Sequence, residues 1–250
     1  MQIEGICAIV SGGANGLGAA TAALLAERGA KVAIFDIDEQ KGLSLAREIG
    51  GIFVKGSVAD QNAVQTTFAT VESEIGIARI LVNCAGIAPS INLLRNEGAH
   101  PIDVFQRTLQ VNLVGTFLMV RQFASCVSRM VPLGEERGVI INTASIAAYD
   151  GTVGQIAYAS SKAGVVGMTL PLARELCADA VRVMTIAPGL FETNMLADVP
   201  GGGRLGSQVP HPNRLGQPRE FASLVETIIR NPMLNAEVIR LDAGLRLPPH

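Results

Sequence analysis

Seven short apolar runs alternate with longer amphipathic segments from one end of this chain to the other. Most of the runs are continuous stretches rich in Val and Ile, a pattern typical of parallel strands buried on both faces of a sheet. We therefore predict strands at 6–11, 32–36, 52–55, 80–84, 138–143, 181–187 and 238–242, and helices near 16–29, 39–49, 61–75, 101–130, 155–177 and 218–230. This alternation predicts a single α/β domain over residues 1–250, with a doubly wound, mostly parallel seven-stranded sheet flanked by helices.

The composition agrees with such a fold and narrows the range of partners. Hydrophobic residues make up 48% of the 250 residues and charged residues 17%, so the chain can bury a core and is not expected to be disordered. A formal net charge of -2 and the lack of a basic run argue against nucleic acid as a partner. Gly, Pro or charge interrupts every apolar run before it reaches the length of a membrane span, so we expect no membrane insertion.

Cysteine usage and the N-terminus indicate the compartment. The four cysteines are scattered and form no CxxC pair, and there are only three histidines, so we predict reduced thiols and no metal site. Few residues precede the first strand, which leaves no room for a cleaved signal. We expect a cytoplasmic protein, or one of the mitochondrial matrix if the source is eukaryotic.

A glycine-rich turn follows the first predicted strand directly and opens the first helix. Its glycines allow backbone N–H groups to approach a pyrophosphate, which the positive end of the helix then faces. A plain structural turn is the alternative, but the position inside a strand–helix–strand unit favours a dinucleotide site. The turn reads Ser11-Gly12-Gly13-Ala14-Asn15-Gly16-Leu17-Gly18, with spacing GxxxGxG.

The second and fourth strands also end in residues suited to a dinucleotide. Asp36 closes the second strand about 20 residues beyond the turn, where a carboxylate binds both hydroxyls of the adenosine ribose and repels a 2′-phosphate. We therefore predict NAD rather than NADP, with a helix-capping role for Asp36 as the alternative. The fourth strand ends in small residues that let a cofactor pass close to the backbone, or simply form a turn: Asn83-Cys84-Ala85-Gly86.

Tyr158 and Lys162 lie four residues apart in a predicted helix and so share one face. A nearby ammonium favours the phenolate and is expected to lower a pKa that is ordinarily about 10. Such a phenol can exchange a proton with a substrate hydroxyl or carbonyl. Ser145, at the end of the fifth strand, can hydrogen-bond the reacting oxygen or merely cap a turn. Asn112, a polar residue in an apolar helix, is either a buried structural amide or part of a proton relay.

Taken together in this order, these residues and Pro188-Gly189 resemble the short-chain dehydrogenase/reductase family over nearly the whole chain. The resemblance implies a Rossmann-like domain that transfers hydride between nicotinamide and an alcohol or ketone. It implies that Tyr158 is the general acid/base and that Ser145 holds the substrate oxygen. It further implies that Lys162 lowers the pKa of Tyr158 and binds the nicotinamide ribose, while Asn112 anchors a water molecule that links Lys162 to solvent.

Segments of the second half, such as Gly138-Val139-Ile140-Ile141-Asn142-Thr143-Ala144-Ser145, resemble the subfamily of type 2 3-hydroxyacyl-CoA dehydrogenases. This implies NAD-dependent interconversion of 3-hydroxyacyl-CoA and 3-oxoacyl-CoA with short or branched acyl chains, by a homotetramer. Ser57 stands where that subfamily has an aspartate at the adenine, so this contact is expected to differ. We expect the substrate to contact Ser145, Gln155 and Tyr158. The expected cofactor contacts are Ser11, Gly12, Asn15, Gly16, Leu17, Gly18, Asp36, Ser57, Val58, Asn83, Cys84, Ala85, Gly86, Tyr158, Lys162, Pro188, Gly189, Phe191 and Thr193.

Two other functions remain open from the sequence. The same site could oxidise a hydroxysteroid or a small secondary alcohol, and the chain could instead be a non-catalytic NAD-binding subunit of an assembly. The Gly- and Pro-rich stretch 190–218 is expected to form a substrate loop, because long loops in compact domains are mostly functional. The helices that contain Asn112 and Tyr158, together with 245–250, are the candidate subunit interfaces.

Overall fold

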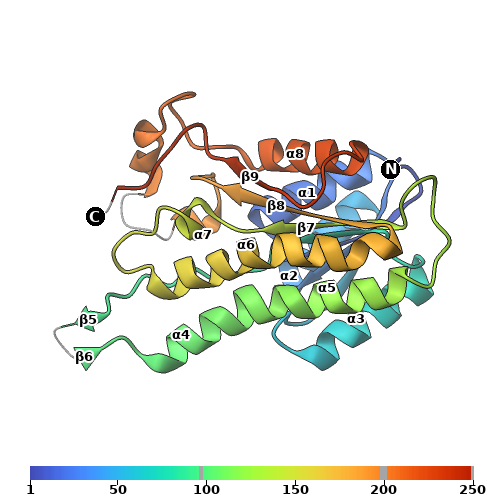
Figure 1. Cartoon of the computed structure of the whole chain (residues 1–250), viewed down its shortest axis with the longest axis horizontal. Helices are drawn as coiled ribbons and strands as arrows, with labels where there is room; N and C mark the ends of the chain where they lie inside the picture. Colours follow the sequence, from blue (N-terminus) through green and yellow to red (C-terminus); the bar gives the residue numbers. More distant parts are fainter. Residues whose placement is uncertain (96–97, 198–201, 249–250) are drawn as a thin grey trace.

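The computed structural model of the chain describes residues 1–95, 98–197 and 202–248. Within these residues a seven-stranded sheet runs through the centre of the molecule (Figure 1), and every neighbouring pair of its strands is parallel. In spatial order the strands are β3 (Ile52–Lys55), β2 (Lys31–Asp36), β1 (Cys7–Ser11), β4 (Ile80–Asn83), β7 (Gly138–Thr143), β8 (Val181–Pro188) and β9 (Val238–Leu241). The predicted doubly wound fold is confirmed.

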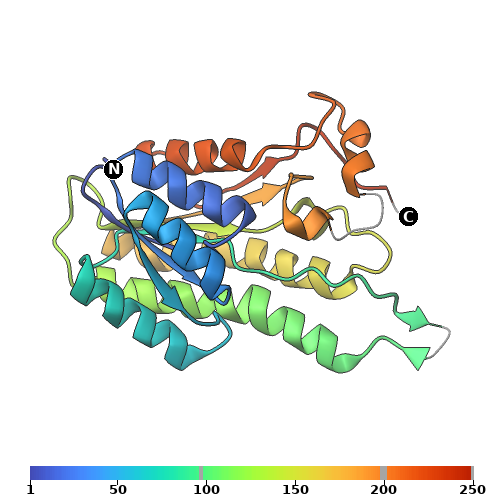
Figure 2. The same cartoon turned by 180° about the vertical axis from the view of Figure 1, so that it is seen from behind.

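Helices cover both faces of the sheet, as the views from the front and from behind show (Figures 1 and 2). One layer consists of α1 (Gly16–Glu27), α2 (Glu39–Ile49) and α8 (Pro218–Arg230); the other consists of α3 (Gln61–Glu74), α4 (Ile102–Leu109), α5 (Gly115–Val127) and α6 (Ile156–Leu176). Alternate residues of each strand enter different layers. In β1, Val10 belongs to the cluster that contains Phe221, and Ile9 to the cluster that contains Phe123. Burial on both faces explains why the strands are continuously apolar.

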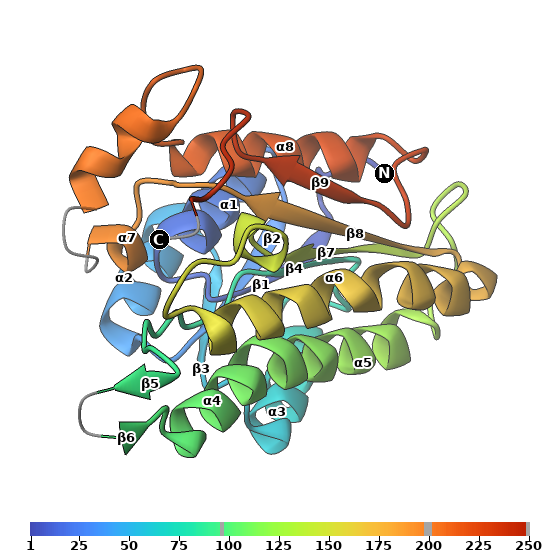
Figure 3. The same ribbon diagram turned by 60° about the vertical axis from the view of Figure 1, so that its left-hand side comes forward.

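The order of the strands determines where a ligand can bind. From β1 the chain moves outward through β2 and β3, then returns to place β4 on the other side of β1. Loops on either side of this reversal diverge and leave a crevice at the carboxyl ends of the strands. Figure 3 shows that end of the molecule, with α7 (Asn194–Ala197) and the short hairpin of β5 (Leu94–Arg95) and β6 (Gly98–Ala99) around it.

The structure departs from the predicted elements in three places. The predicted helix 101–130 is two α-helices joined by a π-helical turn, Gln110–Val114. The hairpin of β5 and β6 was not predicted, because each strand has only two residues. The predicted loop 190–218 contains α7 and a 3₁₀ turn, Gly202–Gln208, while residues 198–201 of that loop lie outside the described part.

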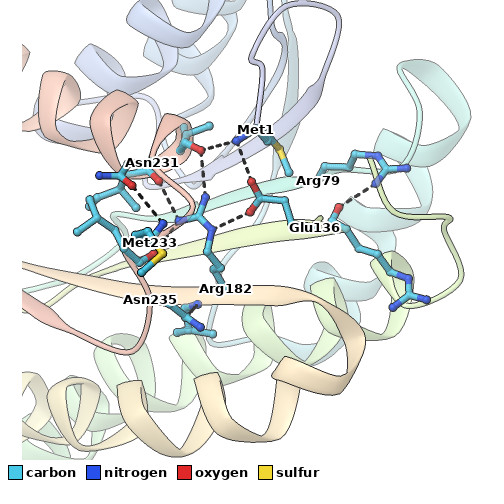
Figure 4. Close-up of polar contacts among 12 residues, drawn as sticks. Met1, Arg79, Glu136, Arg182, Asn231, Met233 and Asn235 are labelled. Carbon is cyan, nitrogen blue, oxygen red and sulfur yellow. Dashed lines mark hydrogen bonds and ion pairs between the residues drawn. The ribbon is translucent and has the colours of Figure 1, made fainter. Parts of the chain in front are cut away.

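A buried ion-pair network holds the opposite end of the sheet together (Figure 4). Arg182 of β8 donates to the Glu136 carboxylate at 2.7 Å and to the backbone oxygens of Ile228, Ile229 and Leu234 at 2.8–3.0 Å. The ammonium of Met1 contacts the other oxygen of Glu136 at 2.8 Å. Burial raises the pKa of Glu136, but the hydrogen bonds and charges of Arg182 and the amino terminus outweigh it and hold the pKa below its usual range. This end of the sheet is therefore structural.

None of the helices in the described ranges combines enough length with enough apolar character to cross a membrane.

Candidate active site

A cavity of about 1260 Å³ opens at the carboxyl edge of the sheet. It is large for a single small-molecule pocket and has room for a cofactor and a substrate together. Of the residues predicted for the site, Gly12, Asn15, Gly16, Leu17, Gly18, Asp36, Ser57, Val58, Cys84, Ala85, Gly86, Ser145, Gln155, Tyr158, Lys162, Pro188, Gly189, Phe191 and Thr193 line this cavity. Ser11, Asn83 and Asn112 do not line it and lie behind its wall.

The glycine turn lies between the carboxyl ends of β1 and β4 and the start of α1. Gly12 has a φ of +65°, and a Cβ built there would lie 2.5 Å from the backbone nitrogen of Ala85. A Cβ on Gly18 would lie 2.1 Å from the oxygen of Gly12, so the helix can meet the turn only with glycine at that position. Asn15 precedes α1 without any side-chain cap. The first N–H groups of α1 are therefore free to bind an anion at the cavity.

Asp36 ends β2 with its carboxylate at the cavity. Its two oxygens accept hydrogen bonds from the backbone nitrogens of Ala14 at 2.9 Å and Asp38 at 3.0 Å. These bonds fix the carboxylate beside the glycine turn. The cap of α2 is instead Asp38, which accepts from the backbone nitrogen of Lys41 at 3.1 Å. The capping alternative for Asp36 is therefore wrong.

A row of buried polar side chains crosses the sheet behind the cavity. Ser11 donates to Asn83 at 3.2 Å, and Asn83 donates to Asn142 at 2.9 Å. These residues lie directly opposite one another on β1, β4 and β7. Ser11 and Asn83 therefore support the strand ends from inside the sheet, rather than presenting their side chains to the cavity as predicted. The sequence does not predict this role for Asn142, because a polar residue within an apolar strand gives no hint of its partner.

Ser145 and Tyr158 both line the cavity, and the Ser145 hydroxyl lies close enough to the Tyr158 phenol to lower its pKa. Ser145 follows β7 and also caps a short 3₁₀ turn by accepting from the backbone nitrogen of Ala147 at 3.1 Å. Tyr158 lies in the first turn of α6. Ser145 therefore caps the turn and also lies beside the phenol, so the two roles predicted for it are compatible.

Lys162 lies 4% exposed beneath this pair, and its ammonium nitrogen lies 5.8 Å from the centroid of the Tyr158 ring. It donates a hydrogen bond to the backbone oxygen of Thr143 at 2.7 Å. Burial lowers the pKa of Lys162 to about 8.

The predicted lowering of the Tyr158 pKa is wrong. Burial raises the pKa of Tyr158 above its ordinary value of 10, and the hydrogen bond from Ser145 offsets this only in part. The ammonium of Lys162 donates to the oxygen of Thr143 and does not contribute to the shift of the Tyr158 pKa. Helical spacing correctly placed the lysine beside the tyrosine, but spacing alone does not report how strongly burial penalises a phenolate.

Asn112 lies fully buried in the π-helical turn. Its side-chain oxygen accepts from the backbone nitrogen of Ile87 at 2.9 Å, and its amide nitrogen donates to the oxygen of Ile87 at 2.8 Å and to Ser161 at 2.9 Å. This side chain therefore ties the segment after β4 to α6, which carries Tyr158. Of the two roles that the sequence left open for Asn112, these contacts match the buried structural amide.

The remaining predicted residues surround the cofactor end and the substrate end of the cavity. Ser57 accepts from the backbone nitrogen of Ala59 at 3.2 Å. Asp60 caps α3 and does not line the cavity, so it does not replace the aspartate missing at position 57.

Burial raises the pKa of the Cys84 thiol to about 11, which keeps it protonated. The side-chain oxygen of Gln155 is buried without a hydrogen-bond partner among the described residues.

The C-terminal segment forms a wall of the cavity that sequence reasoning missed. Leu247 and Pro248 line the cavity. Arg240 of β9 holds this segment, because it contacts Asp150 at 2.5 Å and Asp242 at 2.7 Å and donates to the oxygen of Leu245 at 3.1 Å. Asp150 belongs to the loop between Ser145 and Tyr158, so Arg240 joins that loop to the C-terminal segment. A charged residue on an edge strand carried no signal of this role.

The comparisons with known proteins agree with this geometry. A family model described as short chain dehydrogenase matches residues 6–201. The chain belongs to the short-chain dehydrogenase family. Short-chain dehydrogenases are oxidoreductases that typically bind a nicotinamide cofactor, so this chain is a dehydrogenase, and the predicted membership is confirmed.

Individual relatives match over their full length. The chain is 47% identical to human 3-hydroxyacyl-CoA dehydrogenase type-2, over 99% of this chain and 98% of the relative. It is 46% identical to the Drosophila melanogaster protein of the same name, over 99% of this chain and 100% of the relative. A crystal structure of 3-hydroxyacyl-CoA dehydrogenase type-2 from Mycobacterium avium covers 100% of both chains with a TM-score of 0.94 at 36% identity.

The residues of the cavity fit a dinucleotide. The uncapped start of α1 suits a pyrophosphate, and the Asp36 carboxylate suits ribose hydroxyls. In the ranges that the structure describes, no three His, Cys, Asp or Glu side chains gather as a metal ion would require.

Proposed function

We propose that this short-chain dehydrogenase uses NAD to interconvert 3-hydroxyacyl-CoA and 3-oxoacyl-CoA with short or branched acyl chains. The observation that carries the proposal is the cluster of Ser145, Tyr158 and Lys162 at the floor of a cavity whose other end is the glycine turn. The acyl-CoA substrate class is supported by the full-length similarity to relatives that are named 3-hydroxyacyl-CoA dehydrogenase type-2.

The choice of NAD rests on Asp36. Its carboxylate is held at the cavity by two backbone N–H groups and can accept hydrogen bonds from ribose hydroxyls through its remaining lone pairs. A 2′-phosphate in the same position would meet a like charge. Among the residues that line the cavity, Asp38 adds a second negative charge nearby. Both charges favour an unphosphorylated ribose.

The chain's own residues account for the proton transfer. In the oxidative direction, the phenolate of Tyr158 accepts the proton of the substrate 3-hydroxyl while Ser145 hydrogen-bonds the same oxygen. When bound, the oxidised nicotinamide supplies the acceptor for the hydride released from C3 and a positive charge that favours the phenolate. Lys162 and Asn112 hold α6 against β7 and against the segment after β4, which keeps Tyr158 facing Ser145.

The substrate end of the cavity suits an acyl group. Leu190, Met195, Leu196 and Leu205 of the predicted substrate loop 190–218 line it, together with Val153 from the loop before α6. Gln155 offers a buried oxygen that can accept a hydrogen bond from the substrate. We propose that these residues form the acyl wall and that Gln155, Ser145 and Tyr158 contact the substrate.

Side-by-side kinetics test this function. The purified protein is assayed with NAD and NADP against 3-hydroxybutyryl-CoA, its 2-methyl analogue, hydroxysteroids and simple secondary alcohols. We expect the highest kcat/KM with NAD and a CoA thioester. Equal or higher efficiency on a steroid or a simple alcohol would displace the proposal, and NADH binding without turnover of any substrate would favour a non-catalytic subunit.

We further infer a homotetramer in the cytoplasm, or in the mitochondrial matrix of a eukaryotic source. Val114 and Phe117 on the helix with Asn112, and Leu170 on α6, are 37–44% exposed. These apolar side chains suit a symmetric interface. Leu245, by contrast, is 3% exposed and packs within its own chain. Sedimentation equilibrium tests the assembly, and a monomer would exclude it.

A further inference from the structure

Arg107 differs from the other charged residues of the cavity because its side chain has no partner among the residues that the structure describes. Among the described residues that line the cavity, the cations are Lys162 and Arg107, and the anions are Asp36 and Asp38. Lys162 is buried and bonded to Thr143. The Arg107 side chain is exposed and makes no hydrogen bond or ion pair within the described part of the chain.

The position of Arg107 on α4 makes this lack of a partner informative. Asp103 lies four residues earlier on the same helix, at the spacing that allows an ion pair, yet no pair forms between them. Gln106 and Gln110 also line the cavity, and Gln110 donates to the oxygen of Ala59 at 3.4 Å. The end of α4 and the start of the π-helical turn therefore place three polar side chains at the cavity, and Arg107 is the charged one among them.

The π-helical turn that follows separates Arg107, which lines the cavity, from Asn112, which lies behind its wall. Such a turn inserts an extra residue and changes the angular phase between the residues before and after it. Asn112 lies inside the turn and faces the segment after β4, whereas Arg107 lies before the turn and lines the cavity.

The arginines suggested by the loop sequence do not offer the same site. Arg214 is bound to both carboxylate oxygens of Glu220, at 2.9 and 2.7 Å, and does not line the cavity. The side chain of Arg204 lies outside the described part. Arg107 is thus the described cavity residue with a positive charge still available to a ligand.

We propose that Arg107 binds the phosphate groups of the acyl carrier, so that the cavity recognises coenzyme A by charge at its rim and the acyl group by contact at its floor. The inference rests on the proposed function, because a CoA thioester carries a diphosphate and a 3′-phosphate that a simple alcohol lacks. A guanidinium suits such groups because it donates several hydrogen bonds in one plane.

The experiment compares Arg107→Gln with wild type on two substrates that share the 3-hydroxybutyryl group. One is the CoA thioester, and the other is the N-acetylcysteamine thioester, which has no phosphate. Arg121→Gln is the matched control, since Arg121 is an exposed arginine of α5 that does not line the cavity. We expect Arg107→Gln to raise KM for the CoA thioester about five- to twentyfold. The KM for the short thioester and the Kd for NADH are expected to stay at wild-type values.

The outcomes separate this inference from the proposed function. An unchanged KM for the CoA thioester in Arg107→Gln overturns the phosphate site and leaves the function intact. Equal losses on both thioesters, or weaker NADH binding, also overturn it, because Arg107 would then serve the cofactor or the fold. If wild type fails to oxidise either thioester, the proposed function fails, and titration calorimetry with free CoA then tests the phosphate site. Binding of CoA by wild type but not by Arg107→Gln would support the phosphate site. Equal binding by both proteins, or no binding by either, would overturn the phosphate site. Repeating the kinetics with 3′-dephospho-CoA thioester assigns the contact to the 3′-phosphate or the diphosphate.

Discussion

The ammonium nitrogen of Lys162 lies 2.7 Å from the backbone oxygen of Thr143 and donates a hydrogen bond to it. Because Thr143 ends β7 and Lys162 lies one turn after Tyr158 in α6, this bond joins the central sheet to the helix that carries the phenol. The charge that makes the bond strong is also costly to bury, and burial lowers the pKa of Lys162 to about 8.

This lowered pKa predicts how Lys162 affects stability. Folding moves the pKa from 10.5 to about 8, so between these values the unfolded chain binds more protons than the folded one. The contribution of Lys162 to the free energy of unfolding therefore rises as the pH increases from about 8 to 10.5, by roughly 3 kcal/mol. Urea unfolding of wild type and Lys162→Met across this range measures it, because the titration of other groups cancels in the difference. Parallel curves would show that the buried ammonium keeps its ordinary pKa.

Tyr158→Phe tests the acid/base role directly. Removal of the hydroxyl is expected to reduce turnover by about 10²- to 10⁴-fold, the usual contribution of a positioned proton-transfer group. NADH affinity, measured by fluorescence titration, is expected to remain. Tyr149→Phe is the matched control, because Tyr149 is the other of the two tyrosines and does not line the cavity. Near-normal turnover in Tyr158→Phe would remove the phenol from the mechanism.

The fold was predictable because the inner strands of the sheet are buried on both faces and therefore form continuous apolar runs. Between these runs lie longer amphipathic segments, which form the helices. The π-helical turn at Gln110–Val114 was not, since it depends on the pairing of Asn112 with Ile87, a contact between residues 25 positions apart. The hairpin of β5 and β6 escaped prediction because two-residue strands carry no periodicity.

The sequence indicates a residue's place at the cavity where local backbone geometry fixes it, and gives no signal where that place depends on distant partners. Gly12 has a positive φ and lies close to the backbone of Ala85, and a glycine-rich turn in the sequence indicates that such a conformation is needed. The pKa of Tyr158 depends on burial, which only the folded structure defines. Leu247 lines the cavity in a segment that Arg240 bonds at Leu245, a contact between the C-terminal segment and an edge strand that no local pattern shows.

Asp36→Asn is expected to weaken the preference for NAD. The amide loses the negative charge that repels a 2′-phosphate and accepts ribose hydrogen bonds less strongly. We expect the ratio of kcat/KM for NAD to that for NADP to fall by about tenfold or more, equivalent to about 1.4 kcal/mol. Asp60→Asn serves as control, because Asp60 caps α3 away from the cavity and Asn caps a helix equally well. An unchanged ratio in Asp36→Asn would assign cofactor choice to other residues.

Glu136→Gln is expected to destabilise the fold without affecting the reaction. It leaves the buried Arg182 guanidinium without its counter-charge, which costs about 3–5 kcal/mol. Because the pKa of Glu136 is lowered in the folded state, this contribution is present above the unfolded pKa and is lost as the pH falls through the folded one. The difference in unfolding free energy between wild type and variant should therefore shrink in acid.

The exposed pair of Arg129 and Glu72, at 2.9 Å, provides the comparison for this buried one. Glu72→Gln is expected to cost about 0–1 kcal/mol, because solvent screens the pair. Since the Glu136 network lies at the end of the sheet opposite the cavity, kcat of folded Glu136→Gln should match wild type. A loss as small as that of Glu72→Gln would contradict the structural role of the network.

Arg240→Gln tests whether the C-terminal wall shapes the substrate end of the cavity. Arg240 contacts Asp150 and Asp242 and bonds the oxygen of Leu245, so it fixes the loop before Tyr158 and the segment that carries Leu247. A shorter neutral side chain cannot hold all of these contacts. We expect KM for the acyl substrate to rise several-fold, with a smaller change in kcat and unchanged NADH affinity. Carboxypeptidase digestion should remove the C-terminal residues faster than in wild type. Arg246→Gln is the matched control, because Arg246 also contacts Asp242, at 3.0 Å, and the oxygen of Leu245, at 2.7 Å, but has no bond to Asp150 among the described residues, and its side chain is 61% exposed. If Arg240→Gln lowers only thermal stability and leaves KM at the wild-type value, the C-terminal segment does not contact the substrate.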